Sequence, residues 1–520
     1  MNIASILIQA VDRYPNKEAL VFGERRWTYA QWNARINRLA QGLVELGVRP
    51  FDRVALYLST DEASVTTYFA CQKLGAVAVP MNFRLAAGEV AHILRDSGAR
   101  LLVYSHSLLA NTLDAQKQVH SVHDFISVGA PPDEIPEGHF RFETLAESGD
   151  GSVEPAYRAA PEHLSALVYT SGTTGRAKGV MHTHGNDLAI SMNCVMEYSL
   201  TPSDRALHIA PLYHVGGMQA FYLPHMFVGG TNVVEGRYQA LKTLETIEAQ
   251  RITTLFAVPT QIQEMLFHPR FKEFDVSSLR MITTGGAAIA SATMERVLDE
   301  FCPNLFNGYG MTEASLTLLL HPRDALAKLG SCGKPTLISN ARIITHDPAR
   351  DVRPDEVVRH SEVGQLVVQG PQMMPGYWSN TLETDKKLKY GWLYTGDLFS
   401  RDEDGYFTFH GRADDMIVSG GENIYPREVE EVLYRCPGVK EAAVVGLPDP
   451  KWGSVVSAFI VRAEPHLTVE QVDDFCRNSG LIAAFKRPRQ IRFLDELPVN
   501  PSGKVLKREL VSQYGQGAPA

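Results

Sequence analysis

The stretch 169–179 restricts how this chain can fold more than any other, because its composition suits close contact between the backbone and an anion. It reads Tyr-Thr-Ser-Gly-Thr-Thr-Gly-Arg-Ala-Lys-Gly, so glycines and hydroxyl residues stand beside two cations, Arg176 and Lys178. Glycine lets main-chain N–H groups approach phosphate oxygens, and hydroxyls and cations add donors and positive charge. The apolar run 164–168 before it predicts a strand that leads into a polyphosphate-binding loop.

The spacing of this loop differs from that of the common NTPase loop. That loop has a second glycine five residues after the first, followed by Lys and then Ser or Thr, whereas Ala177 occupies the second glycine position here. A glycine- and hydroxyl-rich stretch on its own is also typical of a solvated hairpin. The other motifs of the chain therefore decide between the two interpretations.

Four further segments follow the loop along the chain. They are 307–313 (Asn-Gly-Tyr-Gly-Met-Thr-Glu), 392–397 (Trp-Leu-Tyr-Thr-Gly-Asp), 411–415 continuing into 420–426, and 501–504 (Pro-Ser-Gly-Lys). In this order, the set resembles the adenylate-forming superfamily of acyl-CoA synthetases, peptide-synthetase adenylation domains and beetle luciferases. The resemblance extends to about Lys507. In its motifs the chain is most similar to aryl-CoA ligases such as 4-chlorobenzoate-CoA ligase.

Length and composition limit the class of protein. A chain of 520 residues is too long for one core and predicts about three or four structural units. With 44% hydrophobic and 21% charged residues, it has the composition of a globular protein. The net charge of −9 argues against a nucleic-acid partner. Sites for anions such as ATP and CoA must therefore use local cations.

Targeting signals are not evident. No apolar run reaches the 18 or so residues that span a bilayer, and residues 1–13 have the apolar spacing of an amphipathic helix and lack the basic leader of a signal peptide. The six cysteines are scattered without a CxxC pair or zinc spacing, which favours reduced thiols. We therefore expect a cytoplasmic enzyme without a transmembrane segment. A monomer and a homodimer both remain open.

The pattern of strands and helices predicts an α/β protein. Short β-branched runs at 54–58, 77–80 and 101–104 alternate with helical patterns, as in parallel sheets covered by helices. The Gly- and Ser-rich segment 147–155 is predicted to join two such layers. After about residue 330 the strands become closely spaced, which predicts a smaller β unit with the form of a distorted barrel.

A last unit is predicted after Arg412, with a helix at 426–433 and a strand at 442–445. The resemblance implies two domains: a large N-terminal domain, 1–413, made of stacked α/β sheets and the distorted barrel, and a small mobile α+β domain, 414–520. It also implies that Asp414 is the hinge about which the small domain rotates.

The resemblance implies an AMP-forming carboxylic acid:CoA ligase that uses ATP, Mg²⁺ and coenzyme A. In such an enzyme the carboxylate attacks the α-phosphorus of ATP and releases pyrophosphate. The CoA thiol then attacks the acyl carbon and releases AMP. Both steps develop charge on oxygen, which positioned cations and backbone donors stabilise.

The resemblance also assigns nucleotide and metal roles to residues of each motif. Thr170 and Lys178 act on the β- and γ-phosphates, and Glu313 binds Mg²⁺. Lys504 reaches the reacting carboxylate and the α-phosphate during adenylation, although a lysine this near a terminus is otherwise a solvated charge. The other implied nucleotide and cofactor contacts are Ser171, Gly172, Thr173, Thr174, Gly175, Gly286, Ala287, Tyr309, Gly310, Thr312, Asp397, Arg412 and Gly421.

Some of these residues have ordinary structural alternatives. Asp397 is expected to accept hydrogen bonds from both ribose hydroxyls, but after Gly396 it could also be a turn residue. Tyr309 is expected to stack on adenine beside the turn at Gly286, and both could equally serve packing. Glu313 alone could satisfy free N–H groups at the start of a helix.

CoA and acyl contacts complete the set. The resemblance implies that Trp452 and Phe485 enclose the CoA adenine while Arg487 and Arg489 bind its phosphates, the alternative being a core Trp and a solvated basic run. His214 is expected next to the acyl carboxylate as an orienting group. The predicted acyl pocket is apolar, without an arginine for a second carboxylate, and Gly308 leaves space at its floor. Besides His214, it comprises Val215, Met218, Phe221, Phe256, Gly308 and Met311.

The acid itself is less well defined by the sequence. Segments 473–479 and 485–488 resemble aryl-CoA ligases acting on benzoates or hydroxycinnamates such as coumarate and ferulate. A medium- or long-chain fatty acid is the alternative substrate. A luciferase-type oxygenase would share the adenylation chemistry. A peptide-synthetase module would need a carrier domain after Lys504, and a non-catalytic nucleotide-binding protein would be expected to lack Lys504 or Glu313.

Overall fold

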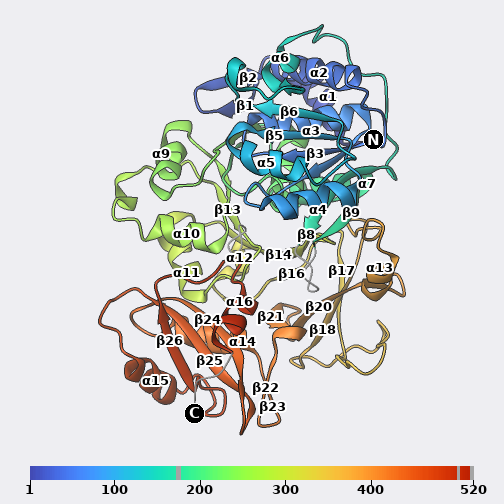
Figure 1. Cartoon of the computed structure of the whole chain (residues 1–520). Coiled ribbons are helices and arrows are strands. Elements are labelled where there is room, and N and C mark those ends of the chain that lie inside the picture. The colour runs from blue at the N-terminus through green and yellow to red at the C-terminus, as the bar shows by residue number, and fades with distance from the viewer. Residues whose placement is uncertain (171–176, 500–503, 516–520) are drawn as a thin grey trace.

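The computed structural model describes residues 1–170, 177–499 and 504–515, and Figure 1 shows their arrangement. Two large sheets and their helices form the upper part of the molecule in this view, and a small sheet and the C-terminal unit lie below. The predicted phosphate contacts Ser171, Gly172, Thr173, Thr174 and Gly175 lie outside the described residues.

The first large sheet has seven strands in the order β7-β6-β5-β3-β4-β8-β9. All neighbours are parallel except β8 and β9, which form an antiparallel edge. The three strands predicted near its start are confirmed as β3 to β5, and the strand predicted before the phosphate loop is β8. The strands are β3 (Arg53–Tyr57), β4 (Val77–Pro80), β5 (Leu101–Ser105), β6 (Asp124–Val128), β7 (His139–Arg141), β8 (Leu164–Thr170) and β9 (Lys178–Thr183).

The second large sheet has nine strands in the order β16-β15-β14-β13-β12-β10-β11-β1-β2. Its centre, from β14 to β1, is parallel, and an antiparallel strand pair closes each end. The strands are β1 (Glu18–Phe22), β2 (Arg25–Thr28), β10 (Arg205–His208), β11 (Thr231–Val234), β12 (Thr254–Phe256), β13 (Met281–Thr284), β14 (Leu305–Met311), β15 (Ser315–Leu320) and β16 (Lys334–Pro335).

Helices fill the space between the two sheets and cover their outer faces. One core joins strands of both sheets to the helices between them, which are α1 (Ile3–Arg13), α2 (Tyr29–Glu45), α3 (Glu62–Leu74), α6 (Phe142–Glu147), α7 (His184–Glu197) and α8 (Leu223–Val228). Separate cores lie under the outer helices, which are α4 (Ala87–Ser97) and α5 (Leu109–Gln116) on the seven-stranded sheet and α9 (Ala240–Gln250), α10 (Pro259–Leu266) and α11 (Ser291–Arg296) on the nine-stranded sheet. The predicted stacked α/β architecture is confirmed.

Helix α3 shows what this stacking demands of the sequence. All of its residues are buried, so the charged Lys73 must find its partners inside. Its ammonium donates to the side chains of Asn33 and Asn37 and pairs with Glu154, at 2.6 Å in each case. Glu154 belongs to the segment predicted to join two layers. That prediction is wrong, because the segment leads from α6 toward β8, and the strands before and after it, β7 and β8, belong to one sheet. The contact with Lys73 holds the segment against α3.

The predicted smaller β unit is a five-stranded antiparallel sheet below the nine-stranded one (Figure 1). Its order is β17-β18-β20-β19. Strand β19 pairs with the start of β20, and β21 pairs with its end, from Asp397 to Arg401. The pairing of the described strands is open, whereas the sequence predicted a distorted barrel. Its strands are β17 (Asn340–Ile344), β18 (Gly364–Gln369), β19 (Leu388–Lys389), β20 (Trp392–Arg401) and β21 (Phe407–Arg412), and two short helices, α12 (Pro322–Ala325) and α13 (Thr381–Lys387), lie before β17 and β19.

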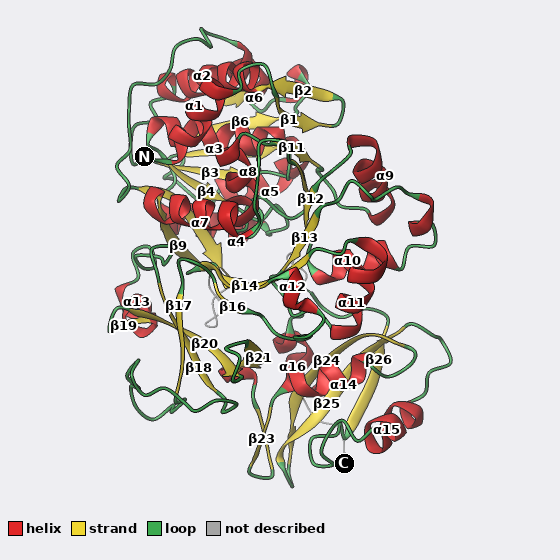
Figure 2. Cartoon of the chain, turned by 180° about the vertical axis from the view of Figure 1, so that it is seen from behind, coloured by secondary structure: helices red, strands yellow, loops and turns green. Residues whose placement is uncertain are grey.

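The C-terminal unit has its own apolar cores. In Figure 1, and from behind in Figure 2, it lies at the end of the molecule opposite α1 and α2. Asp414 lies in the short turn Ala413–Asp415 that leads into it. The predicted helix and strand are confirmed as α14 and β24; the elements are β22 (Ile417–Ser419), β23 (Glu422–Ile424), α14 (Pro426–Tyr434), β24 (Val439–Asp449), β25 (Gly453–Arg462), α15 (Val469–Asn478), β26 (Gln490–Leu494) and α16 (Lys507–Tyr514).

A hydrogen bond ties this unit to the loop between β13 and α11: Arg427 of α14 donates to the Ile289 carbonyl at 2.9 Å. Within the described ranges, no helix has both the length and the apolar character needed to cross a bilayer.

Three buried histidines predict how stability depends on pH. Burial lowers the pKa of His184 and His225 to about 4 and that of His208 to about 3, from an ordinary 6.5. The unfolded chain binds protons below pH 6.5 and these folded sites do not, so their stabilisation is complete above pH 6.5 and is lost as pH falls toward 4. At pH 5 each of these histidines therefore lowers the free energy of unfolding by about 2 kcal/mol relative to its value above pH 6.5. Asp61, whose pKa burial raises to about 7, acts in the opposite direction.

We therefore expect the Tm of the wild type to fall as the pH is lowered from 7.5 to 5. The Tm of His208→Gln should fall by less over the same range, measured from its own value at pH 7.5. Exposed His120 supplies the matched control, since His120→Gln should keep the slope of the wild type. Equal slopes for all three proteins would contradict the assignment.

Candidate active site

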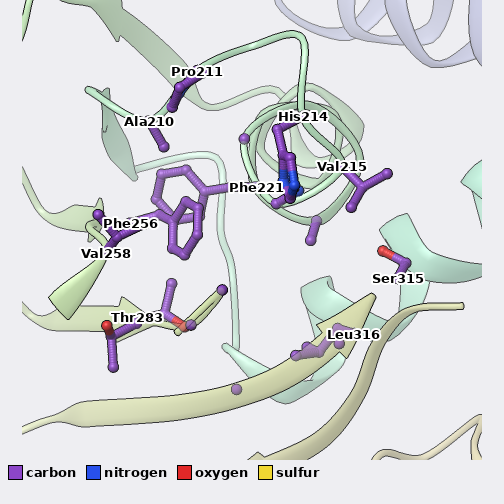
Figure 3. Close-up of a pocket in the computed structure, with 18 of the residues that line it drawn as sticks. Ala210, Pro211, His214, Val215, Phe221, Phe256, Val258, Thr283, Ser315 and Leu316 are labelled. Carbon is purple, nitrogen blue, oxygen red and sulfur yellow. The ribbon is translucent and has the colours of Figure 1, made fainter. Parts of the chain in front are cut away.

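A cavity opens at the carboxyl ends of the central strands of the nine-stranded sheet (Figure 3). It encloses about 720 Å³ when its open mouth is included, and its lining is mostly apolar. The rings of Phe221 and Phe256 line one side, 6.0 Å apart and tilted by 45°. Carboxyl ends of parallel strands are where α/β sheets bind ligands. Of the predicted pocket residues, the lining includes His214, Val215, Phe256, Gly308 and Met311.

Met218 is not among the lining residues, so its predicted place in the pocket wall is wrong. It starts a π-helical turn, Met218–Tyr222, in which the N–H of Tyr222 donates to the carbonyl of Gly217. The wider turn puts Phe221 on the cavity and Met218 in the core between the sheets.

The floor beside Gly308 also differs from the prediction. A Cβ added at Gly308 would meet the Leu316 side chain at 2.7 Å, so Leu316 of β15 already fills the space that the glycine leaves. Figure 3 shows Leu316 along the bottom of the cavity. The floor is therefore closed by the partner strand of β14.

His214 lies at the cavity with a neutral imidazole. The surrounding wall removes water from the ring and lowers its pKa to about 4. The backbone N–H of Gly216 donates to Nδ1 at 3.4 Å, a long contact that leaves the proton on Nε2. His214 can therefore donate one hydrogen bond at neutral pH.

Asp397 connects three of the sequence motifs, 307–313, 392–397 and 411–415, through contacts with Tyr309 and Arg412. It lies in β20, opposite Arg412 of β21, and not in a turn. The Arg412 guanidinium approaches its Oδ1 at 3.3 Å, and the Tyr309 hydroxyl donates to its Oδ2 at 2.6 Å. Tyr309 packs edge-on against Phe399, with ring centroids 4.9 Å apart. Its hydroxyl therefore links β14 of the large sheet to the small sheet.

Glu313 is a second buried carboxylate. Its Oε1 accepts a hydrogen bond from the Tyr377 hydroxyl at 2.7 Å, and Oε2 makes no hydrogen bond within the described part of the chain. The described residues hold no cluster of three or more His, Cys, Asp or Glu side chains that could bind a metal by themselves. One carboxylate oxygen fits Mg²⁺, which completes its shell with substrate phosphates and water.

Lys178 contacts the same tyrosine, Tyr377, that donates a hydrogen bond to Glu313. Its ammonium lies over the Tyr377 ring, 5.6 Å from the centroid, and forms an ion pair with Glu383 of α13. Hydrogen bonds from Lys178 and Lys386 lower the pKa of Glu383 to about 2. Thr170, at the end of β8, precedes the residues outside the described range. The predicted phosphate lysine is thus paired with a carboxylate in this structure.

Lys504, in the C-terminal unit, lies near the nucleotide motifs. Burial lowers its pKa, and Arg412 lowers it further while Asp397 and Asp415 raise it. None of the predicted CoA residues is in the cavity lining: Trp452 and Phe485 are 45% and 44% exposed, and Arg487 pairs with Asp473. Arg489 donates to the Ala484 carbonyl. Gly421 lies in the turn between β22 and β23. Ala287 follows Gly286, which lines the cavity.

Comparison with known proteins settles the family. The model of the AMP-binding enzyme family matches residues 7–378, and that of the AMP-binding enzyme C-terminal domain matches residues 428–504. The chain belongs to the AMP-binding enzymes. The predicted superfamily and enzyme class, acid–thiol ligase, are confirmed by its relatives.

Among these AMP-binding enzymes, the chain is similar to a feruloyl-CoA synthase of Amycolatopsis sp, with 37% identity over 96% of both proteins. It is also similar to a long-chain-fatty-acid–CoA ligase of Mycobacterium tuberculosis, with 34% identity over 100% of this chain and 99% of the relative. Its structure matches the crystal structure of an anthranilate CoA ligase in complex with anthranoyl-AMP, with a TM-score of 0.91, 28% identity and coverage of 99% and 97%.

The structure adds polar residues that sequence reasoning missed. Thr284 and Ser315 line the cavity with hydroxyls that have no hydrogen-bond partner among the described residues. Glu383 and Lys387 of α13 lie beside the nucleotide motifs. None belongs to a recognised motif position, and the α13 pattern gave no periodic signal, so only the three-dimensional arrangement identifies them.

The ion pair of Lys178 predicts an effect on nucleotide binding. Because Glu383 competes with a triphosphate for this ammonium, Glu383→Gln should lower the Kd for ATP about fivefold, the upper range for a partly exposed pair. AMP lacks the β- and γ-phosphates, so its Kd should not change. Titration calorimetry of the wild type, Glu383→Gln and the exposed α13 control Asp385→Asn would measure both constants. Equal gains for AMP and ATP would refute the competition.

Proposed function

We propose that this protein is an AMP-forming ligase that joins an aromatic carboxylic acid to coenzyme A through an acyl-adenylate. The observation that carries the proposal is the juxtaposition of an apolar cavity, lined by Gly310 and Met311, with two carboxylates next to it. Glu313 lies in the hairpin that follows Met311, and Asp397 of β20 is hydrogen-bonded to Tyr309 of the strand that lines the cavity. An acid in the cavity would present its carboxylate to a nucleotide held at those two carboxylates.

In the first half-reaction His214 orients the acid's carboxylate by donating from Nε2. Asp397 accepts the ribose hydroxyls, Arg412 holds Asp397 in place, and Thr170 and Lys178 bind the outer phosphates once Glu383 releases Lys178. Glu313, with Thr312 beside it, would hold Mg²⁺, which when bound neutralises charge on the phosphates. Lys504 stabilises the charge that develops around the α-phosphate.

In the second half-reaction the C-terminal unit turns about Asp414. The exposed side chains of Trp452 and Phe485 then bind the CoA adenine, and Arg487 and Arg489 bind its phosphates. The exposure of two large aromatic rings on one small unit supports this role, since such rings are ordinarily buried unless they meet a partner. A large domain 1–413 and a cytoplasmic location remain predictions from the sequence, which leaves both a monomer and a homodimer open.

The cavity supports an aromatic acid over a fatty acid. The rings of Phe221 and Phe256 and the closed floor at Leu316 suit a flat, compact group. The hydroxyls of Thr284 and Ser315, which are 1% and 3% exposed, need polar partners, and Figure 3 shows the Ser315 oxygen on the side toward the cavity. An alkyl chain would leave both hydroxyls unpaired, whereas a hydroxycinnamate such as coumarate or ferulate brings a phenol or methoxy oxygen. The fatty-acid–CoA relative keeps a fatty acid as the second candidate.

Removal of Lys504 tests the division of labour between the half-reactions. Lys504→Ala should slow pyrophosphate release from acid and ATP by about 10²-fold or more, the scale for one preorganised donor. Acyl-CoA formation from synthetic acyl-AMP should be spared. Lys507→Ala, which removes a nearby cation paired with Glu430, is the control and should leave both steps near normal. Equal damage to both steps by Lys504→Ala would count against the assignment.

The two free hydroxyls predict a substituent preference. The wild type should favour 4-hydroxycinnamate over cinnamate by about tenfold in kcat/KM, since an unsatisfied buried polar group costs about 1–3 kcal/mol. Ser315→Ala combined with Thr284→Val should bring the ratio near one by slowing only the hydroxylated acid. If both acids lose rate equally, the hydroxyls contact the carboxylate instead of the ring, and the substituent preference is wrong.

A further inference from the structure

Lys387 is a partly buried cation beside the nucleotide motifs that no motif assigns. It is the last residue of α13, and its Nζ donates to the Thr395 carbonyl at 2.9 Å. A Cβ added at Gly396 would lie 3.3 Å from this Nζ, so the ammonium rests against the backbone that leads directly into Asp397. Gly396, at φ +79°, leaves open the space that the ammonium uses.

The surroundings of Lys387 differ from those of its neighbours on α13. Lys386 is exposed and pairs with Glu383, which also pairs with Lys178. Lys387 has no carboxylate within ion-pairing distance among the described residues, and the Thr395 carbonyl is the one hydrogen-bond acceptor it contacts there. An ammonium carries three donors, so two remain for a ligand.

Lys387 lies among charges of both signs. Burial and Arg412 lower its pKa, while Glu313, Asp397 and Asp414 raise it. Two of these carboxylates are the proposed metal and ribose ligands, and the contacts with Thr395 and Gly396 place Lys387 beside the backbone that leads into the ribose ligand. A phosphate is the ligand chemistry that pairs with a buried ammonium at this place.

Lys387 and Lys504 belong to different parts of the chain. Lys504 follows Asp414 and moves with the C-terminal unit in the proposed rotation, whereas α13 and β20 belong to the part before it. Lys387 therefore keeps its position relative to Asp397 in both half-reactions. When CoA attacks, an S–C bond forms, the C–O bond to the phosphate breaks, AMP leaves with the bonding electrons, and the thiol proton passes to water. The phosphate then gains charge after Lys504 has left.

We propose that Lys387 binds the adenylate phosphate in both half-reactions and stabilises AMP as the leaving group in the second. Only the catalytic part of this role rests on the proposed function. The phosphate-binding part can be measured without turnover. A lysine that merely supports β20 would affect every ligand of the site equally.

Binding of AMP and adenosine separates these possibilities. Lys387→Met keeps the length of the apolar stem and removes the charge, and it should weaken AMP about 10- to 100-fold, the range for a hydrogen bond to a charged group, while changing adenosine less than twofold. Lys387→Arg should retain AMP affinity within a few fold. Lys386→Met is the matched control and should leave both affinities unchanged. Equal loss of AMP and adenosine in Lys387→Met would overturn the proposal.

Two single-step assays test the catalytic part. Lys387→Met should slow both pyrophosphate release and acyl-CoA formation from synthetic acyl-AMP by tenfold or more, in contrast to Lys504→Ala, which should slow only the first. A loss confined to the first step would overturn the role in thioester formation. If the wild type forms no acyl-CoA from any acid, the proposed function fails, and the comparison of AMP with adenosine still decides whether Lys387 binds phosphate.

Discussion

The carboxylate of Asp397 is the point on which the arrangement of the active site depends. It receives a hydroxyl from Tyr309 of the nine-stranded sheet and a guanidinium from Arg412 of the small sheet. A buried carboxylate needs such partners to offset its lost hydration, and the hydrogen bond from Tyr309 holds β14 of the nine-stranded sheet next to β20 of the small sheet. The cavity floor, the Glu313 hairpin and the turn at Asp414 all follow within a few residues of these three side chains.

Local charge, and not net charge, makes the site suitable for an anion. The chain carries a formal charge of −9, yet Lys178, Lys387, Arg412 and Lys504 gather where the nucleotide motifs meet. In the described residues Lys178 is neutralised by Glu383, whereas Lys387 has no such partner. The outer phosphates must displace a carboxylate, while the inner phosphate meets a cation that is already available. This difference favours retention of the adenylate after pyrophosphate departs.

The sequence predicted the parts of this arrangement that repeat in motifs or in periodic patterns. Parallel strands, helix α14 and the motifs that contain Asp397 and Glu313 follow from strand patterns and ordered motifs. Met218 was misplaced because a π-turn has no signature in residue spacing, and the space beside Gly308 is filled from a partner strand, which a linear reading does not show. Lys387 carries no local signal at all, because its role depends on β20 lying next to the end of α13.

Ser315 combines a strained backbone with a buried hydroxyl that has no hydrogen-bond partner among the described residues. Its φ of +50° is unusual for a residue other than glycine, and it arises where the hairpin is tightest, since a Cβ on Gly310 would lie 2.1 Å from the Ser315 carbonyl oxygen. Backbone strain of this kind costs about 1–3 kcal/mol, and an unpaired buried hydroxyl costs a similar amount. Alanine at this position would remove the second cost and keep the hairpin. A substrate oxygen that accepts from Ser315 removes it only when bound, so the hydroxyl converts part of the folding free energy into selectivity for acids that carry such an oxygen.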